Sequence, residues 1–103
     1  MQQLTHQNII QALSIQGNNL LIELPLPSTP LKTTQWAEGF ATLFDFTCYE
    51  ADWGADRYQI RLRNNDVECL LCIEWLCEAM WLTPLGQSHS ATFLKDWLYQ
   101  KKS

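Results

Sequence analysis

The chain has 103 residues and a formal net charge of −4, and 47% of its residues are hydrophobic against 17% that are charged. This composition is too apolar for intrinsic disorder, and no uncharged apolar run is long enough to span a membrane. The length suits a single domain, residues 1–103, and the acidic balance disfavours binding to a nucleic-acid phosphate backbone. No signal peptide is visible at the N-terminus, so we expect a cytoplasmic protein.

Residues 9–24 are predicted to form a β-hairpin. Apolar and polar residues alternate on both sides of Gly17-Asn18-Asn19, and glycine and asparagine tolerate the backbone conformation of tight hairpin turns. Pro25 and Pro27 then end the second strand, because proline cannot donate to the ladder of hydrogen bonds.

Residues 29–46 are predicted to form the first helix. Thr29 suits the N-cap and Pro30 suits the first helical position. The apolar side chains recur at the spacing of one helical face, at Trp36, Phe40, Leu43 and Phe44. We expect this face to pack on a sheet.

Residues 47–75 are predicted to form three antiparallel strands. A two-residue turn at Asn64-Asn65 brings apolar residues together on one face and places cations opposite anions on the other. A second turn, at Gly54-Ala55, pairs Asp52 with Arg57 across the strands. These two turns therefore predict the register of both hairpins.

Residues 76–82 are compatible with either a strand or a helical turn, and we favour a strand that the turn at 83–86 closes. Residues 90–101 are predicted to form a second helix. The expected fold class is α+β, a mostly antiparallel β-sheet with two packed α-helices in the order β-β-α-β-β-β-β-α. Whether these helices cover one face of the sheet or both is left open.

The four cysteines are the first candidates for chemistry. Cys69 and Cys72 have the spacing of half a zinc knuckle, but they lie in an apolar strand, where the two thiols would point to opposite faces. We therefore predict reduced thiols without a metal at Cys48, Cys69, Cys72 and Cys77, and we expect no cofactor. The sequence contains no catalytic constellation that we could assign.

A second group of candidates lies in the loop that follows residue 52 and at the end of a later strand. Acidic residues can act as general acids or as ligands, and Glu74 and Glu78 have no obvious cross-strand partner. One hypothesis is therefore a small ligand-binding domain or an enzyme that uses Asp52, Trp53, Asp56, Arg57, Glu74 and Glu78.

The leading hypothesis is a binding or protein-interaction module that forms a homodimer. The outer face of the last strands is expected to carry more apolar side chains than two helices need, and such a patch must be covered by a helix or by another chain. The expected interface residues are Leu70, Leu76, Met80 and Leu82. A third hypothesis, nucleic-acid binding by Arg57, Arg61 and Arg63, is disfavoured because the interleaved Tyr58 points to the opposite face.

Two stretches resemble a family of small gamma-proteobacterial proteins classed as a domain of unknown function. They are the residues Gly54-Ala55-Asp56-Arg57-Tyr58 and the later segment that runs from Glu74 through Cys77-Glu78-Ala79-Met80-Trp81-Leu82. The resemblance implies a stand-alone bacterial protein of the cytoplasm. It implies no activity, ligand or catalytic residue.

Overall fold

The computed structural model describes residues 4–86 and 90–101. Its strands form one six-stranded antiparallel sheet in the order β1-β2-β6-β5-β4-β3. This arrangement confirms the α+β class and the expected order of the strands and the two longer helices. The elements are α1 (His6–Gln11), β1 (Leu13–Gln16), β2 (Asn19–Ile22), α2 (Pro30–Phe44), β3 (Thr47–Trp53), β4 (Arg57–Arg63), β5 (Glu68–Glu74), β6 (Ala79–Leu85) and α3 (Ala91–Gln100).

Helix α1 is an element that the sequence reading missed. The predicted hairpin was wrong at its N-terminal end, because residues 9–12 belong to this helix and its C-cap and not to a strand. The side chain of Thr5 accepts a hydrogen bond from the backbone N–H of Asn8 and caps the helix. Ile9 is fully buried in the core. The hairpin itself forms as predicted, with Gly17 at a φ of 60° in the turn and Leu13 opposite Ile22.

Helix α2 forms where the sequence predicted it. Thr29 is the N-cap, its hydroxyl accepts from the N–H of Lys32, and Pro30 opens the helix. Asp45 ends it in the left-handed conformation, and its N–H bonds the carbonyls of the last turn. The face that packs on the sheet is fully or almost fully buried at Thr33, Ala37, Phe40, Ala41 and Phe44.

The hairpin between β4 and β5 keeps the predicted faces but not the predicted register. Asn64 closes a wider turn, because its side-chain oxygen accepts from the N–H groups of Asp66 and Val67. Arg63 therefore lies opposite Glu68, two residues further along than expected. An even shift preserves the alternation, so the apolar residues still share one face.

The hairpin between β3 and β4 departs from the predicted pairing more strongly. Asp52 lies opposite Gln59 rather than Arg57, and the register shifts between Tyr49 and Asp52. Glu50 has a φ of 52° in this irregular stretch. Between these two pairs β3 therefore has one residue more than β4, which is the definition of a β-bulge.

The segment 76–82, whose pattern is compatible with a strand or a helical turn, divides into a turn and the start of β6. Trp75 to Glu78 form the turn, with the N–H of Glu78 on the carbonyl of Trp75, and β6 begins at Ala79. Glu74 lies opposite Ala79. The expected strand is therefore confirmed, but it starts three residues after the start of the ambiguous segment and continues through residues 83–85, where the sequence predicted a turn.

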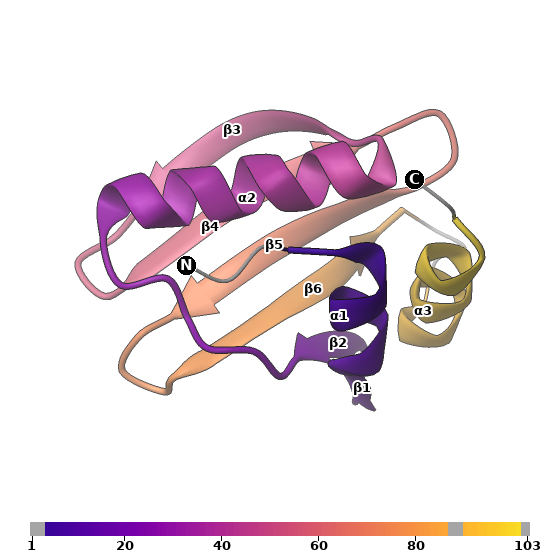
Figure 1. Cartoon of the computed structure of the whole chain (residues 1–103), viewed down its shortest axis with the longest axis horizontal. Coiled ribbons are helices and arrows are strands. Elements are labelled where there is room, and N and C mark those ends of the chain that lie inside the picture. The colour runs from indigo at the N-terminus through magenta and orange to yellow at the C-terminus, as the bar shows by residue number, and fades with distance from the viewer. Residues whose placement is uncertain (1–3, 87–89, 102–103) are drawn as a thin grey trace.

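The helices contribute to one core on one face of the sheet. Figure 1 shows α1 and α2 in front of the strands, and α3 packs against β1, β2 and β6 at one end. Side chains from α1, α2 and α3 belong to the same buried cluster as the inward residues of the strands. The opposite sheet face has no helix over it in the described ranges. None of the helices described has the length and apolar character needed to cross a bilayer.

Candidate functional site: a pocket at the sheet end and an open sheet face

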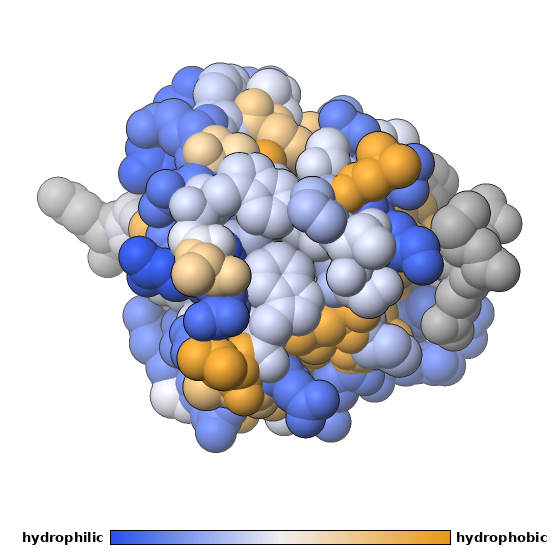
Figure 2. Space-filling model, turned by 90° about the vertical axis from the view of Figure 1, so that its left-hand side faces the viewer, coloured by the Kyte–Doolittle hydropathy of each residue, from blue (hydrophilic) through white to orange (hydrophobic). Residues whose placement is uncertain are grey.

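A shallow pocket, which we call the sheet-end pocket, lies at the end of the sheet where two turns meet. It has a volume of about 360 Å³ and is lined by Ala55, Asp56, Arg57, Glu74 and Leu76. This is the end at which α2 begins and at which the β3–β4 and β5–β6 turns lie (Figure 1). Figure 2 views this end directly and shows hydrophobic side chains as separate patches among hydrophilic ones. The pocket therefore combines both signs of charge with a small apolar surface.

Backbone hydrogen bonds fix the two turns to each other. The N–H of Gly54 donates to the carbonyl of Arg57 at 2.8 Å and closes the first turn. The N–H of Trp75 donates to the carbonyl of Asp56 at 2.9 Å, and the Trp75 indole donates to the carbonyl of Pro27 at 2.8 Å. The pocket walls are therefore tied to the segment that leads into α2.

The charges of this pocket are close neighbours that do not pair. Arg57 lies directly opposite Glu74 in the ladder, yet no ion pair within 4.0 Å joins them. Glu74 instead accepts a hydrogen bond from the thiol of Cys77 at 3.1 Å. The Arg57 side chain lies against Gly54, where an added Cβ would come within 2.9 Å of its Cγ. Within the described residues, the guanidinium has no ion pair and no hydrogen bond.

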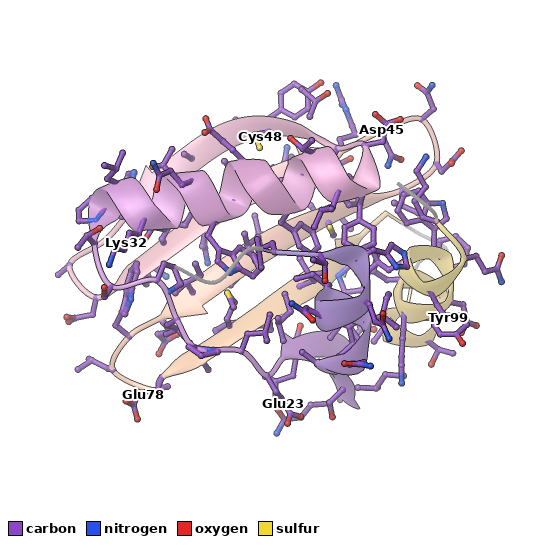
Figure 3. The ribbon with its side chains drawn as sticks, in the orientation of Figure 1. Glu23, Lys32, Asp45, Cys48, Glu78 and Tyr99 are labelled. Atoms are coloured by element: carbon purple, nitrogen blue, oxygen red, sulfur yellow. The ribbon has the colours of Figure 1, made fainter. Side chains whose placement is uncertain are left out.

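The structure brings together three of the six predicted ligand-binding residues, Asp56, Arg57 and Glu74. Asp52 is exposed opposite Gln59 on the outer face, and the expected pairing of Asp52 with Arg57 across the turn is wrong. Trp53 packs on Tyr58 with ring centroids 4.4 Å apart and remains 47% exposed. Glu78 projects away from the molecule at the tip of the β5–β6 turn (Figure 3). These last three do not line the pocket.

Two of the four predicted interface residues are placed wrongly by the sequence reading. Met80 and Leu82 are fully buried, opposite Ile73 and Leu71 on the helix side of the sheet. A strand continuing from β5 would have turned them outward, but the turn at 75–78 reverses the chain. Because Glu74 pairs with Ala79, the even-numbered residues of β5 and the odd-numbered residues of β6 share a face.

The other two predicted interface residues are accessible, but at different places. Leu70 lies half-buried on the open sheet face, opposite Thr83. Leu76 is 78% exposed in the β5–β6 turn and lines the shallow pocket. The sequence predicted an apolar outer face and left open what covers it. Of the four predicted interface residues, Leu70 alone lies on the open sheet face.

The open sheet face has an apolar strip at its centre. Its members come from neighbouring strands: Leu21 lies opposite Trp81, Trp81 lies opposite Cys72, and Leu70 lies two residues before Cys72. Leu21, Leu70 and Trp81 are half-buried, and Cys72 is only 4% exposed. We call these four residues the open-face strip.

Arginines border the open-face strip along β4. Arg61 bonds two carboxylates, with Glu50 and Glu68 each 3.2 Å away. Arg63 lies over the ring of Tyr49, 4.7 Å from the ring centroid. The bond to Glu68 is diagonal, since Leu70 is the residue opposite Arg61. Arg61 and Arg63 therefore already bind side chains of the sheet itself.

The four cysteines have free thiols in different environments. Cys69 is fully buried, and burial raises its pKa far above the ordinary value. Burial also raises the pKa of Cys72 to about 11. Cys48 lies in β3, opposite Leu62, where burial and the charge of Glu38 raise its pKa (Figure 3). Among the described residues, no group of three or more His, Cys, Asp or Glu could hold a metal ion.

The stability of the fold is expected to fall as pH rises from about 9 to about 11. The Cys72 thiol stays protonated up to about pH 11 when folded, whereas an unfolded thiol ionises from about pH 9, so the unfolded chain binds fewer protons in this window. The advantage in unfolding free energy of the wild type over Cys72→Ala should shrink by about 1–2 kcal/mol between these limits.

Urea denaturation across this pH range measures the difference. The comparison variant is Cys77→Ala: this thiol is exposed, and its hydrogen bond to Glu74 also raises its pKa, so its difference from the wild type should shrink as well, but by less than that of Cys72→Ala. A difference between wild type and Cys72→Ala that stays the same from pH 8 to 11 would refute the assignment.

A larger groove lies on the helix side and was not predicted. Its volume is about 950 Å³, and it runs along α2 beside the segment 24–28 and the start of α1. Its apolar surface comes from Leu4, Leu24, Leu26, Trp36 and Leu43. Pro25 and Pro27, which the sequence predicts to end the second strand, also form part of this wall. The run Leu24-Pro25-Leu26-Pro27 was the feature of the sequence from which this wall could have been predicted.

Comparison with known proteins gives one match. No curated protein and no solved structure matches the chain. The model of a family described as "Protein of unknown function (DUF3630)" matches residues 9–100, which include all of the strands, α2, α3 and the sheet-end pocket. The chain therefore belongs to the DUF3630 family of proteins of unknown function.

Proposed function

We propose that this protein is an interaction module that self-associates through the open face of its sheet. The observation that carries the proposal is the open-face strip, Leu21, Leu70, Cys72 and Trp81, which lies at the centre of a face without a helix over it in the described ranges. Apolar surface that a monomer leaves accessible favours association, because its burial releases water.

The surroundings of the strip support a protein partner. Tryptophan, tyrosine and arginine are enriched where proteins bind each other, and this face presents Trp81 at its centre with Tyr49, Arg61 and Arg63 on its border. Glu68 lies on the same border and is bonded to Arg61. Both signs of charge therefore occur around an apolar centre.

A second copy of the chain is the occupant that fits this face. A two-fold axis through the strip would bring the same apolar residues of both copies together, which is the commonest geometry of soluble dimers. Strands β3 to β6 are each seven residues long, and at a spacing of about 4.8 Å they offer roughly 450 Å² of projected surface per copy. A standard interface takes about 800 Å² from each partner, so we expect a weak, reversible dimer.

Sedimentation velocity over a range from low micromolar to near-millimolar concentration tests the proposal. The sedimentation coefficient of the wild type should rise with concentration as dimers form. Trp81→Lys should remain monomeric at every concentration, because a cation in the strip would have to lose its hydration in the interface.

Two further variants locate the interface. Leu31→Lys makes the same apolar-to-cation change at an exposed position of α2 and should associate like the wild type. Leu26→Lys alters the helix-side groove. A wild type that is monomeric throughout, or association lost in Leu26→Lys and retained in Trp81→Lys, would overturn the proposal.

A further inference from the structure

We infer that the sheet-end pocket binds a small zwitterion with an apolar side chain, the chemistry of an apolar α-amino acid. This inference concerns a different surface from the open-face strip and does not depend on self-association. It rests on opposite charges that face a common cavity without neutralising each other, at Arg57 and Glu74.

The first step of the argument concerns Arg57. Cross-strand neighbours of opposite charge ordinarily attract each other, and Arg61 shows this on the same strand by bonding both Glu50 and Glu68. Arg57 differs, since none of the described residues pairs with its guanidinium. A guanidinium that borders a cavity and keeps its donors available matches the two oxygens of a carboxylate.

The second step concerns the carboxylates on the other side of the cavity. Glu74 comes from the end of β5 and Asp56 from the β3–β4 turn, and both line the pocket with Arg57. Among the residues that the structure describes, Glu74 accepts only the weak hydrogen bond of the Cys77 thiol, at 3.1 Å. An ammonium group can therefore bind between Glu74 and Asp56 while a carboxylate of the same molecule binds Arg57.

The third step concerns size and the apolar contact. A volume of about 360 Å³ is at the small end of ligand pockets, which range over about 300–1,000 Å³. Ala55 and Leu76 provide the apolar part of the lining, and Leu76 is 78% exposed without a ligand. A short apolar side chain on the ligand would cover Leu76. These features together select an amino acid such as leucine over a larger metabolite.

Titration of the full chain with L-leucine, followed by two-dimensional NMR of the backbone amides, tests the inference. Leucine should shift the amides of Gly54, Ala55, Arg57 and Leu76, with weak affinity because the pocket is open. Two ligands with a single charge, 4-methylpentanoate and 3-methylbutylamine, should each bind at least about tenfold more weakly, since each satisfies only one side of the pocket.

Variants then assign the charges. Arg57→Gln and Glu74→Gln should each weaken leucine binding at least about tenfold. Gly54→Ala preserves every charge but displaces the Arg57 side chain, and it should weaken binding as well. Arg63→Gln removes an exposed arginine of the same strand that does not line the pocket, and it should bind like the wild type.

Each outcome is decisive. An absence of amide shifts at tens of millimolar leucine would overturn the inference. Equal binding by the wild type and Arg57→Gln would overturn it too, as would equal binding of leucine and its single-charge analogues. The amide spectra report in the same experiment whether each variant is folded.

Discussion

Replacement of Phe40 by alanine should lower the free energy of unfolding by about 3–5 kcal/mol. Phe40 is fully buried at the centre of the α2–sheet contact. Its ring centroid lies 5.0 Å from that of Phe44, 5.5 Å from that of Trp36 and 6.2 Å from that of Phe46. Removing this ring leaves a cavity that three rigid neighbours cannot fill. The loss is a large share of the stability of a domain of this size.

Chemical denaturation monitored by circular dichroism measures this loss. Leu31→Ala provides the control on the same helix, because Leu31 is 68% exposed and its truncation should change the unfolding free energy by no more than about 0.5 kcal/mol. If Phe40→Ala unfolded at the same denaturant concentration as the wild type, the assignment of the buried helix face would be incorrect.

Replacement of Met80 by lysine should destabilise the protein by at least about 4 kcal/mol and leave it largely unfolded. Met80 is fully buried opposite Ile73, on the side of the sheet that α1 and α2 cover. An ammonium group there would lose its hydration without gaining a partner. Far-ultraviolet circular dichroism and a thermal melt report the result directly.

The neighbouring residue gives a strict control. Ala79 is half-exposed and points to the open side of β6, opposite Glu74. Ala79→Lys should fold normally, because its cation reaches solvent next to a carboxylate. A folded Met80→Lys together with an unfolded Ala79→Lys would show that the two faces of β6 are reversed.

The strands and their buried faces could be predicted from the sequence because a strand repeats every two residues. In β4, Tyr58, Ile60 and Leu62 alternate with polar residues, and all three are buried in the core. The same reasoning found α2, where capping residues and a helical spacing agree. These patterns depend only on neighbours along the chain, so one sequence is enough to recognise them.

The turns could not be predicted as well, because their length depends on side-chain hydrogen bonds. The amide of Asn64 bonds two backbone N–H groups and widens its turn, which moves the register by two residues. The turn after Glu74 has four residues, and it reverses which positions of β6 face inward. An unrecognised turn of this kind led directly to the misplacement of Met80 and Leu82.

The candidate site was predicted only in part, because its shape also depends on the turns. Asp56, Arg57 and Glu74 were expected to share a region, and the structure places them around one pocket. Glu78 was included because a continuous strand would have kept it on the face of Glu74. The contribution of Leu76 to the pocket, and the whole helix-side groove, depend on contacts between segments far apart in the sequence.

The two outermost strands of the sheet have a consequence for aggregation. An edge strand that is long and regular can pair with another chain and extend the sheet into a fibre. Here β1 has only four residues, and β3 is interrupted between Tyr49 and Asp52, where Glu50 takes a left-handed backbone and presents its charge. Neither edge offers the uninterrupted row of backbone groups that templates strand addition. The sheet is thus protected at both margins against uncontrolled polymerisation.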